Sequence, residues 1–491
     1  MAIGTVLIAN RGEIALRILR TCRELGIRTV AVYSVADAGT PVVRAADAAV
    51  CIGPEAAKRS YLNIAALIEA ARLAGADAIH PGYGFLSEDP DFAEVCEAEG
   101  LRFVGPSATV LALLGDKSSA RMMMAKAGLP LLPGTLQPVY PGAEAEHAAV
   151  EVGYPLIVKA VAGGGGRGMQ VVTDPAELPA ALAQTRASAL NLFGDGRVYL
   201  ERYLPSARHV EVQVLADEYG SVISLGARDC TVQRRRQKLI EETPPPSLAE
   251  TDVERMTGDA VRGAREAGYV GAGTFEFIVD DAGQHYFMEV NCRIQVEHPV
   301  TEMVTGVDIV AEQLRIAAGQ PLSMIQQDVA PRGAAIECRV NAENPDRGFA
   351  PSPGLLTEFW PPAGPFVRVD THAEPGHRLA AAYDSLLAKV IVWAPTRMAA
   401  ISRMQRALLE CRIRGAGLHT TVGFLQRVLD DDRFRSARHR TNLVDEISAG
   451  SSTGHLYRIP SDPKAIAIPR RRRISCKRIP LALSFLSSLS R

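Results

Sequence analysis

Two glutamates in a predicted β-hairpin could hold a divalent cation. The chain from 273 to 290 has the alternation of two strands, and Asp280-Asp-Ala-Gly283 supplies the turn between them. If the hairpin centres on the last peptide bond of this turn, Glu276 and Glu289 lie directly opposite each other, with Cβ atoms about 5 Å apart. Two carboxylates at that distance repel unless a cation lies between them, and oxygen ligands suit Mg²⁺.

The polar alternation continues beyond the hairpin. Asn291 shares a face with Glu289, and Arg293, Gln295 and Glu297 keep that parity if the chain stays extended. One face would then present metal ligands, a cation, an amide and a carboxylate, a set suited to phosphoryl transfer to a small anion. A solvent-facing polar hairpin is the alternative. It explains the alternation but not this mixture of groups.

A glycine-rich loop could cover nucleotide phosphates. Its glycines are Gly163, Gly164, Gly165, Gly166 and Gly168, in a run that formally matches G-x-G-x-x-G. A Rossmann loop needs a helix after it, whereas strands are predicted on both sides here, so we expect a flexible flap whose backbone N–H groups approach phosphate oxygens. Lys159, at the end of the incoming strand, would neutralise phosphate charge. An ordinary surface hairpin is the alternative, but ordering so many glycines costs entropy.

The elements before this region alternate between strand and helix. Short apolar runs predict strands, and the stretches between them have helical periodicity. This alternation predicts an α/β fold that begins with a doubly wound parallel sheet, up to about residue 115. The predicted strands are Thr5–Ala9, Thr29–Tyr33, Ala76–His80 and Leu101–Val104.

Pattern changes along the chain predict three domains and a tail. We expect an N-terminal domain over 1–115, a central domain over 116–332 with a smaller lid over 133–203, and a mixed α+β domain over 333–445. Residues 446–491 include the basic run 470–473 and are expected to form a disordered, solvated tail. Binding of a polyanion by that run is the alternative.

Composition limits the class of protein. The 491 residues carry a net charge of -1, so no global attraction to nucleic acid or to an acidic membrane is expected. None of the 8 cysteines forms a C-x-x-C pair, and no apolar run is long enough to span a bilayer. No signal peptide is recognisable, and we expect a cytoplasmic protein with reduced thiols.

Long strings of residues give the chain a family resemblance. Over roughly residues 3–445 it resembles biotin carboxylases of the ATP-grasp fold, which implies an ATP-grasp central domain with a glycine-rich lid. The matching strings are Ile-Ala-Asn-Arg-Gly-Glu-Ile-Ala (8–15), Ile-His-Pro-Gly-Tyr-Gly-Phe-Leu-Ser-Glu (79–88), Gly-Asp-Lys (115–117), Lys-Ala-x-x-Gly-Gly-Gly-Gly-Arg-Gly-Met (159–169), Gly-Ala-Gly-Thr-Phe-Glu-Phe (271–277), Arg-Ile-Gln-Val-Glu-His-Pro-Val-Thr-Glu (293–302), Glu-Cys-Arg-Val-Asn-Ala-Glu (337–343) and Pro-Ser-Pro-Gly (351–354).

The resemblance implies a role for each matching residue. The nucleotide-binding set it implies is the glycine loop with Lys117, Lys159, Glu201, His209, Gln233 and Lys238. The metal ligands it implies are Glu276, Glu289 and Asn291, and the bicarbonate site is Lys238, Arg293, Gln295 and Val296. Glu297 would be the base that deprotonates bicarbonate, and Arg339 would stabilise the biotin enolate; with Arg293 and Lys238 these form the implied catalytic group.

The implied reaction is the first half-reaction of an acetyl-CoA or related acyl-CoA carboxylase. ATP, Mg²⁺ or Mn²⁺ and bicarbonate would give carboxyphosphate, which then carboxylates biotin. No Met-Lys-Met biotinylation motif occurs in the chain, so biotin is expected on a separate biotin carboxyl carrier protein. Carboxyltransferase subunits are the other expected partners, and the resemblance implies a homodimer.

The chain departs from the family pattern at a few positions. Arg236 replaces a usual histidine, Ala227 replaces an acid, and Cys292 replaces a common threonine; the segment 344–348 is one residue longer. Because arginine carries a permanent charge, Arg236 puts nucleotide affinity or selectivity in question. These departures keep open a non-catalytic or altered-specificity ATP-grasp paralogue. A further alternative is another ATP-grasp ligase, such as a carbamoyl-phosphate-type or carboxylate–amine ligase, but Arg339 and the string 293–302 speak against it.

Overall fold

The computed structural model describes residues 3–162 and 168–450. Its contacts divide the chain into a compact unit that ends at Ile447 and a second unit, Ser448–Arg491. The elements described here belong to the first unit, apart from the end of the last helix. Over the described ranges, no helix is long and apolar enough to cross a membrane.

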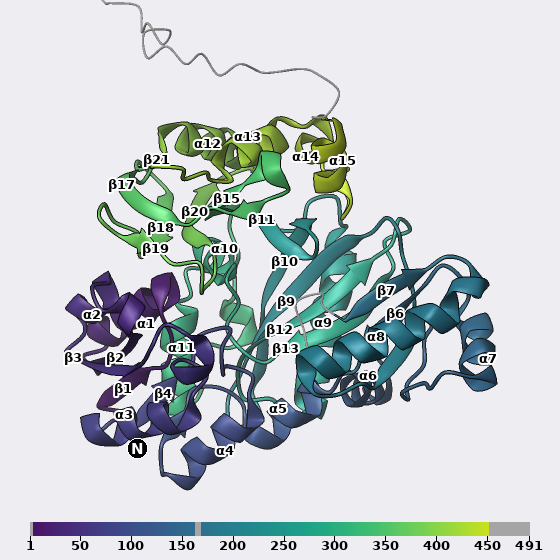
Figure 1. The fold of residues 1–491 in the computed structure, drawn as a ribbon, viewed down its shortest axis with the longest axis horizontal. Helices are drawn as coiled ribbons and strands as arrows, with labels where there is room; N and C mark the ends of the chain where they lie inside the picture. Colours follow the sequence, from purple (N-terminus) through teal and green to yellow (C-terminus); the bar gives the residue numbers. More distant parts are fainter. Residues whose placement is uncertain (1–2, 163–167, 451–491) are drawn as a thin grey trace, which may run out of the picture. The chain divides into compact units, whose positions relative to one another are not determined.

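Five parallel strands form the N-terminal sheet, in the order β3-β2-β1-β4-β5 (Figure 1). Both faces are buried, since Val6 and Ile8 belong to one core while Leu7 and Ala9 belong to another. The predicted doubly wound sheet is therefore confirmed. Its strands are β1 Thr5–Ile8, β2 Arg28–Ser34, β3 Ala48–Gly53, β4 Ala78–His80 and β5 Arg102–Phe103. Its helices are α1 Gly12–Glu24, α2 Pro41–Ala45, α3 Ile64–Ala74 and α4 Pro90–Ala98, and the next helix, α5 Ala108–Gly115, packs into the central core.

A small antiparallel sheet with its own apolar core forms the lid. The strand order is β7-β6-β8, and helices α7 and α8 cover it. The predicted strands on both sides of the glycine run are present, so the run joins β6 to β7 rather than opening a helix. The elements of this region are α6 Lys117–Lys126, α7 Ala143–Val152, β6 Leu156–Ala160, β7 Met169–Val172, α8 Leu178–Phe193 and β8 Val198–Arg202.

One eight-stranded sheet runs from the centre of the chain into its C-terminal part. Its order is β13-β12-β9-β10-β11-β14-β20-β18, so β11 and β14 pair across the predicted boundary at 332/333. The predicted domain boundaries themselves remain predictions. The central elements are β9 Arg208–Ala216, β10 Val222–Arg234, β11 Gln237–Thr243, α9 Glu250–Glu266, β12 Gly271–Val279, β13 His285–Asn291, α10 His298–Thr305 and α11 Ile309–Ala317.

The C-terminal part adds strands to that sheet and packs helices on it. Helix α12 packs on β14 and β20 and, with α13, encloses an apolar core (Figure 1). The elements are β14 Ala334–Asn341, β15 Glu343–Asn344, β16 Ala350–Pro351, β17 Gly354–Trp360, β18 Val367–Thr371, β19 Arg378–Leu379, β20 Leu386–Ala394, α12 Arg397–Glu410, β21 Arg412–Gly415, α13 Val422–Asp430, α14 Asp432–Arg435 and α15 Leu443–Gly450. Short 3₁₀ helices occur at Val35–Asp37, Ala57–Arg59, Pro175–Glu177, Gln326–Asp328 and Pro345–Arg347.

Candidate active site

The β12–β13 hairpin places Glu276 directly opposite Glu289, as predicted. The position of the turn that gives this register differs from the predicted position. The turn centres on Ala282, half a residue earlier, and a bulge at Met288 restores the opposition. The bulge also shifts the alternation of the strand, so that Phe287 is buried in the apolar core while Glu289 lies on the opposite face.

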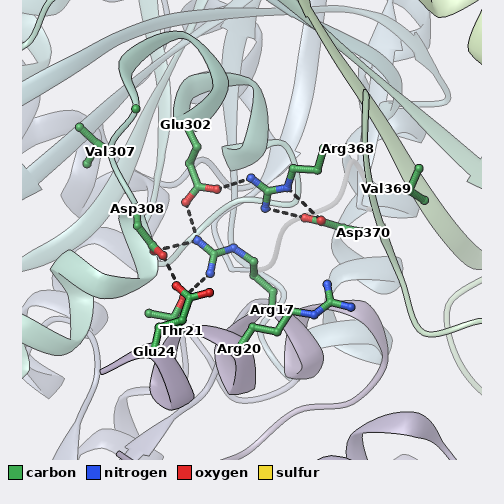
Figure 2. Close-up of a pocket in the computed structure, with 11 residues that line it drawn as sticks. Arg17, Arg20, Thr21, Glu24, Glu302, Val307, Asp308, Arg368, Val369 and Asp370 are labelled. Carbon is green, nitrogen blue, oxygen red and sulfur yellow. Dashed lines mark hydrogen bonds and ion pairs between the residues drawn. The ribbon is translucent and has the colours of Figure 1, made fainter. Parts of the chain in front are cut away.

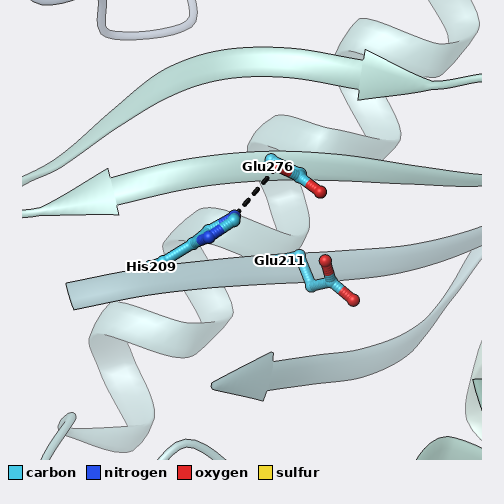
Figure 3. Close-up of side chains that lie close together, drawn as sticks. All are labelled: His209, Glu211 and Glu276. Atoms are coloured by element: carbon cyan, nitrogen blue, oxygen red, sulfur yellow. Dashed lines mark ion pairs between the residues drawn. The ribbon is translucent and has the colours of Figure 1, made fainter. Parts of the chain in front are cut away.

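Glu276 lies at the centre of a buried polar cluster. Its carboxylate accepts hydrogen bonds from Lys238 Nζ at 2.9 Å, Asn291 Nδ2 at 2.9 Å and Gln295 Nε2 at 3.2 Å. His209 Nε2 lies 2.9 Å from its other oxygen, and Figure 3 shows this pair beside Glu211. Burial opposes ionisation, but Lys238 and His209 hold the pKa of Glu276 below its ordinary value. Glu276 is therefore an anion.

Lys238 joins three carboxylates that come from different elements. Its Nζ lies 2.6 Å from Glu211, 2.9 Å from Glu276 and 2.6 Å from Glu297. Burial disfavours an ammonium, yet the surrounding anions raise the pKa of Lys238 well above its ordinary value. One permanent cation thus connects the metal-ligand hairpin with the predicted base.

Glu297 is fully buried and held by two cations. Lys238 contacts its Oε1, and Arg339 Nη2 donates to its Oε2 at 2.8 Å. Burial raises its proton affinity, but Lys238 and Arg339 outweigh this effect and keep the pKa of Glu297 well below its usual range. The chain does not stay extended as far as Glu297, because β13 ends at Asn291 and Glu297 precedes the first residue of α10.

The residues between the hairpin and α10 hold one another in place. Arg293 donates to Asn291 Oδ1 and to Gln295 Oε1, each at 2.8 Å, and its Nε donates to Glu88 at 2.8 Å. The carbonyl of Val296 accepts a hydrogen bond from Lys389 Nζ at 2.9 Å. The predicted anion-binding side chains therefore lie on one side of this segment, next to Glu276.

Two further lysines from the predicted nucleotide set reach the same region. Lys117, the first residue of α6, lies 2.9 Å from Glu289, whose charge helps to raise the lysine's pKa against burial. Lys159 on β6 contacts Glu201 on β8, which Arg121 also contacts. Burial lowers the pKa of Lys159, although Glu201 partly offsets this effect.

For two other predicted nucleotide-binding residues, Gln233 and Gly168, the structure gives backbone positions. Gln233 lies opposite Lys238 in the β10–β11 register. Gly168 follows the gap in the described chain and has φ +66°, a left-handed conformation that favours glycine. Gly163, Gly164, Gly165 and Gly166 lie outside the described residues.

Glu211 is a site residue that the sequence reasoning missed. It is fully buried on β9, directly opposite Glu276, and contacts Lys238 and Arg228. The alternation of polar residues at 209, 211 and 213 could have signalled a polar strand face. No local pattern, however, tells which strand β9 pairs with.

The donor set on the hairpin fits a divalent cation. Glu276, Glu289 and Asn291 offer carboxylate and amide oxygens, the ligands that Mg²⁺ and Mn²⁺ prefer. Glu211 adds charge, and its ligand atom lies within 4.8 Å of those of His209 and Glu276. Each carboxylate already pairs with a protein cation, and a divalent ion would join or displace these pairs.

The departures from the family pattern have different structural settings. Ala227 belongs to the apolar core, so the missing acid removes no charge from the polar cluster. Arg236 lies in the tight turn between β10 and β11 with φ +67°, beside Arg235 at φ +47°. Cys292 is buried, and its N–H donates to Glu88 at 2.8 Å.

A separate cavity of about 400 Å³ lies between α1, the start of α11 and β18. Figure 2 shows that two of its arginines, Arg17 and Arg368, pair with carboxylates. Arg17 contacts Glu302 at 2.8 Å and Asp308 at 2.7 Å, and Arg368 contacts Glu302 and Asp370, each at 2.7 Å. None of the predicted site residues that the structure describes lines this cavity.

Three family models match the chain in succession. Residues 2–111 match the biotin carboxylase N-terminal domain, 116–325 the ATP-binding domain of the carbamoyl-phosphate synthase L chain, and 337–446 the biotin carboxylase C-terminal domain. Together they cover most of the chain.

Known proteins resemble the chain over nearly its whole length. A biotin carboxylase from Nostoc sp. is 50% identical over 91% of this chain and 100% of its own, and a pyruvate carboxylase subunit from Methanothermobacter thermautotrophicus is 49% identical over 91% of this chain and 90% of its own. The crystal structure of the Hydrogenobacter thermophilus 2-oxoglutarate carboxylase biotin carboxylase domain dimer, with MgADP, ADP and bicarbonate, superposes with a TM-score of 0.88. It is 45% identical and covers 91% of this chain and 98% of that one.

Proposed function

The chain belongs to the biotin carboxylase family, so it is an ATP-dependent ligase that carboxylates biotin, and we propose that the residues around Lys238 and Arg339 carry out this reaction. The observation that carries the assignment is the position of Glu297. It is a buried anion between Lys238 and Arg339, next to the bicarbonate-binding segment.

The first step is attack of bicarbonate on the γ-phosphate of ATP. Arg293, Gln295 and the backbone of Val296 would hold the anion, with Lys238 beside it. Glu297, kept ionised by its two cations, would accept the hydroxyl proton as the new P–O bond forms and ADP leaves. Lys117, Lys159 and His209 would bind the polyphosphate together with the glycine loop.

A divalent cation fits the hairpin ligands Glu276, Glu289 and Asn291. When bound, it would neutralise charge on the phosphate oxygens. The protein's own task at this position is to keep the three oxygen donors together. Lys238 and His209 do this for Glu276, and Lys117 does it for Glu289.

The second step transfers the carboxyl group. Carboxyphosphate breaks down to CO₂ and phosphate, the phosphate takes the ureido proton of biotin, and the resulting enolate attacks CO₂. Negative charge then develops on the ureido oxygen. Arg339 would stabilise it, because a fixed guanidinium in a partly dry site needs little reorganisation.

Bicarbonate-dependent ATP hydrolysis, measured with and without free biotin, tests the proposed function. Stimulation by biotin is the expected result. Turnover that depends on an amine or another carboxylate would point to a different ATP-grasp ligase. Nucleotide binding without any turnover would point to a non-catalytic paralogue.

The family also implies partners for this chain. We propose that biotin arrives on a biotin carboxyl carrier protein and that a carboxyltransferase completes the reaction, in a homodimer like the domain dimer of the Hydrogenobacter relative. Relatives include both biotin carboxylases and a component of pyruvate carboxylase, and assays of the assembled enzyme with acetyl-CoA and with pyruvate distinguish these acceptors. The cytoplasmic location stays a prediction.

A further inference from the structure

Four charged side chains lie on one face of β11, β14 and β20. Glu241 lies opposite Glu337, and Arg339 lies opposite Lys389, so each cross-strand pair has like charges. Glu241, Glu337 and Lys389 are fully buried. Like charges directly opposite one another destabilise a sheet. Such an arrangement is stable only if other charges, hydrogen bonds or protonation offset the repulsion within each pair.

The two cations of this group, Arg339 and Lys389, have hydrogen-bond or ion-pair partners. Arg339 donates from Nε to Glu241 at 2.6 Å and from Nη2 to Glu297 at 2.8 Å. Lys389 donates to the Val296 carbonyl at 2.9 Å and lies 3.1 Å from Glu13. Glu241 and Glu297 therefore hold the guanidinium from two sides.

Three of the four carboxylate oxygens of the two acids lack such partners in the part of the chain that the structure describes. Oε2 of Glu241 and both oxygens of Glu337 have no hydrogen-bond partner among the described residues, although all three atoms are buried. An unpaired buried carboxylate is costly, so adjacent carboxyls of this kind share a proton. A proton on Glu337 removes one of the two negative charges and supplies a donor on the residue directly opposite Glu241.

The electrostatic environment supports a proton on Glu337 and an ionised Glu241. Burial raises the pKa of Glu337 well above its ordinary value, and Lys389 and Arg339 only partly oppose it. Burial also raises the pKa of Glu241, to about 7, against the effect of Arg339 and with a contribution from Glu297; Lys238 is the other cation that faces it. Glu337 is thus the neutral member, and Glu241 is the one that ionises.

We propose that Glu241 is a positioning residue for Arg339, and that the Glu241–Glu337 pair retains one proton so that Glu241 can hold the guanidinium as an anion. The inference rests on the roles proposed for Glu297 and Arg339. When Glu297 accepts the bicarbonate proton, it becomes neutral and its hold on Arg339 weakens. Glu241 then keeps Arg339 in place for the charge that develops on the ureido oxygen.

This role has a consequence for the pH dependence. Glu241 must be ionised to anchor Arg339, so the biotin-stimulated rate rises with pH through about 7. ATP hydrolysis that depends on bicarbonate alone uses Glu297 rather than Arg339. It should lack this rise.

The test is Glu241→Gln, assayed for bicarbonate-dependent ATP hydrolysis with and without free biotin across the pH range. We expect the biotin-stimulated component to fall by about tenfold or more and to lose its rise near neutral pH, while hydrolysis without biotin falls by less than about threefold. The KM for ATP should change little in comparison with kcat, because the residues proposed to bind the polyphosphate, Lys117, Lys159 and His209, come from other elements.

Glu242→Gln is the matched control. Glu242 is the next residue on the same strand, equally buried, and pairs with Arg397 at 2.6 Å. Its loss should lower stability but leave the biotin stimulation and its pH profile intact. Glu337→Gln should also keep both, because the amide N–H replaces the proposed acid proton as a donor to Glu241.

Three results would overturn the proposal: full biotin stimulation in Glu241→Gln, a neutral-pH rise that survives in that variant, or loss of the rise in Glu337→Gln. If Glu241→Gln does not fold, the wild-type profile and Glu337→Gln still decide, because absence of the rise in either contradicts the proposal. Failure of the proposed function is distinguishable, since the wild type itself would then show no bicarbonate-dependent hydrolysis.

Discussion

At the scale of single residues, Glu297 is the proposed general base of the reaction. Replacing it with glutamine keeps its size but removes the proton acceptor between Lys238 and Arg339. We expect Glu297→Gln to retain ATP binding and to lose bicarbonate-dependent turnover by about 100-fold or more, the usual contribution of a general base. Calorimetric nucleotide titration and steady-state ATP hydrolysis measure the two properties.

The control for this variant is Glu312→Gln on α11. Glu312 is also buried and accepts a hydrogen bond from the Ser323 N–H at 3.1 Å, away from the site. It should keep its turnover. Near wild-type turnover in Glu297→Gln itself would remove this glutamate from the mechanism.

Lys238 sets the protonation state of its neighbours. Burial raises the pKa of Glu297, whereas Lys238 and Arg339 lower it. Removal of Lys238 therefore lets the pKa of this carboxyl rise from its depressed value. Because the base must be ionised, turnover of Lys238→Gln should fall more steeply than that of the wild type as the pH is lowered. The ratio of bicarbonate-dependent rates at about pH 8 and pH 6 measures this effect. An unchanged ratio would show that Lys238 does not control the base.

At the scale of elements, the start of β14 depends on a glycine. Gly333 has φ +70°, and a Cβ there would lie 2.4 Å from the carbonyl oxygen of Ala394 on β20. We expect Gly333→Ala to destabilise the protein by about 1–3 kcal/mol, through backbone strain and displacement of β20. The thermal unfolding midpoint measures it.

The matched control is Gly258→Ala within α9. A Cβ at Gly258 meets nothing within 4 Å. Alanine is a better helix former than glycine by about 1 kcal/mol, so this variant should be as stable as the wild type or more so. Equal midpoints for the two variants would contradict the strain assigned to Gly333.

At the scale of the whole molecule, ligand binding should couple the lid, α6 and the hairpin. Lys159, Lys117 and Glu289 come from these three elements, and we propose that all three act at the nucleotide site. ADP should therefore raise the unfolding temperature, and more so with Mg²⁺ than with a chelator, because ligands that bind only the folded state stabilise it. Differential scanning fluorimetry measures both shifts.

Glu289→Gln should remove most of the Mg²⁺-dependent increment and keep the shift caused by ADP alone. The control is Glu266→Gln, since Glu266 pairs with the exposed Lys126 at 2.7 Å, at the protein surface. If Glu289→Gln responds to Mg²⁺ as the wild type does, Glu289 is not a metal ligand.

The sequence by itself determined the features whose signals are local. Alternation and turn residues predicted the β12–β13 hairpin, and strand–helix alternation predicted the doubly wound sheet, whereas the opposition of Glu276 and Glu289 also required the bulge at Met288. Long motif strings gave the family. These features depend on neighbours within one hairpin, one βαβ unit or one motif, so they can be recognised from spacing alone.

Only the tertiary structure decided which distant strands share a face. Glu211, Lys238 and Arg339 lie on β9, β11 and β14, and the sheet order brings their side chains into one cluster with Glu297. Cross-strand register between segments far apart in the chain depends on packing of the whole sheet, as the bulge at Met288 also does. The buried acid pair Glu241 and Glu337 arises from that register, and no local sequence pattern predicts it.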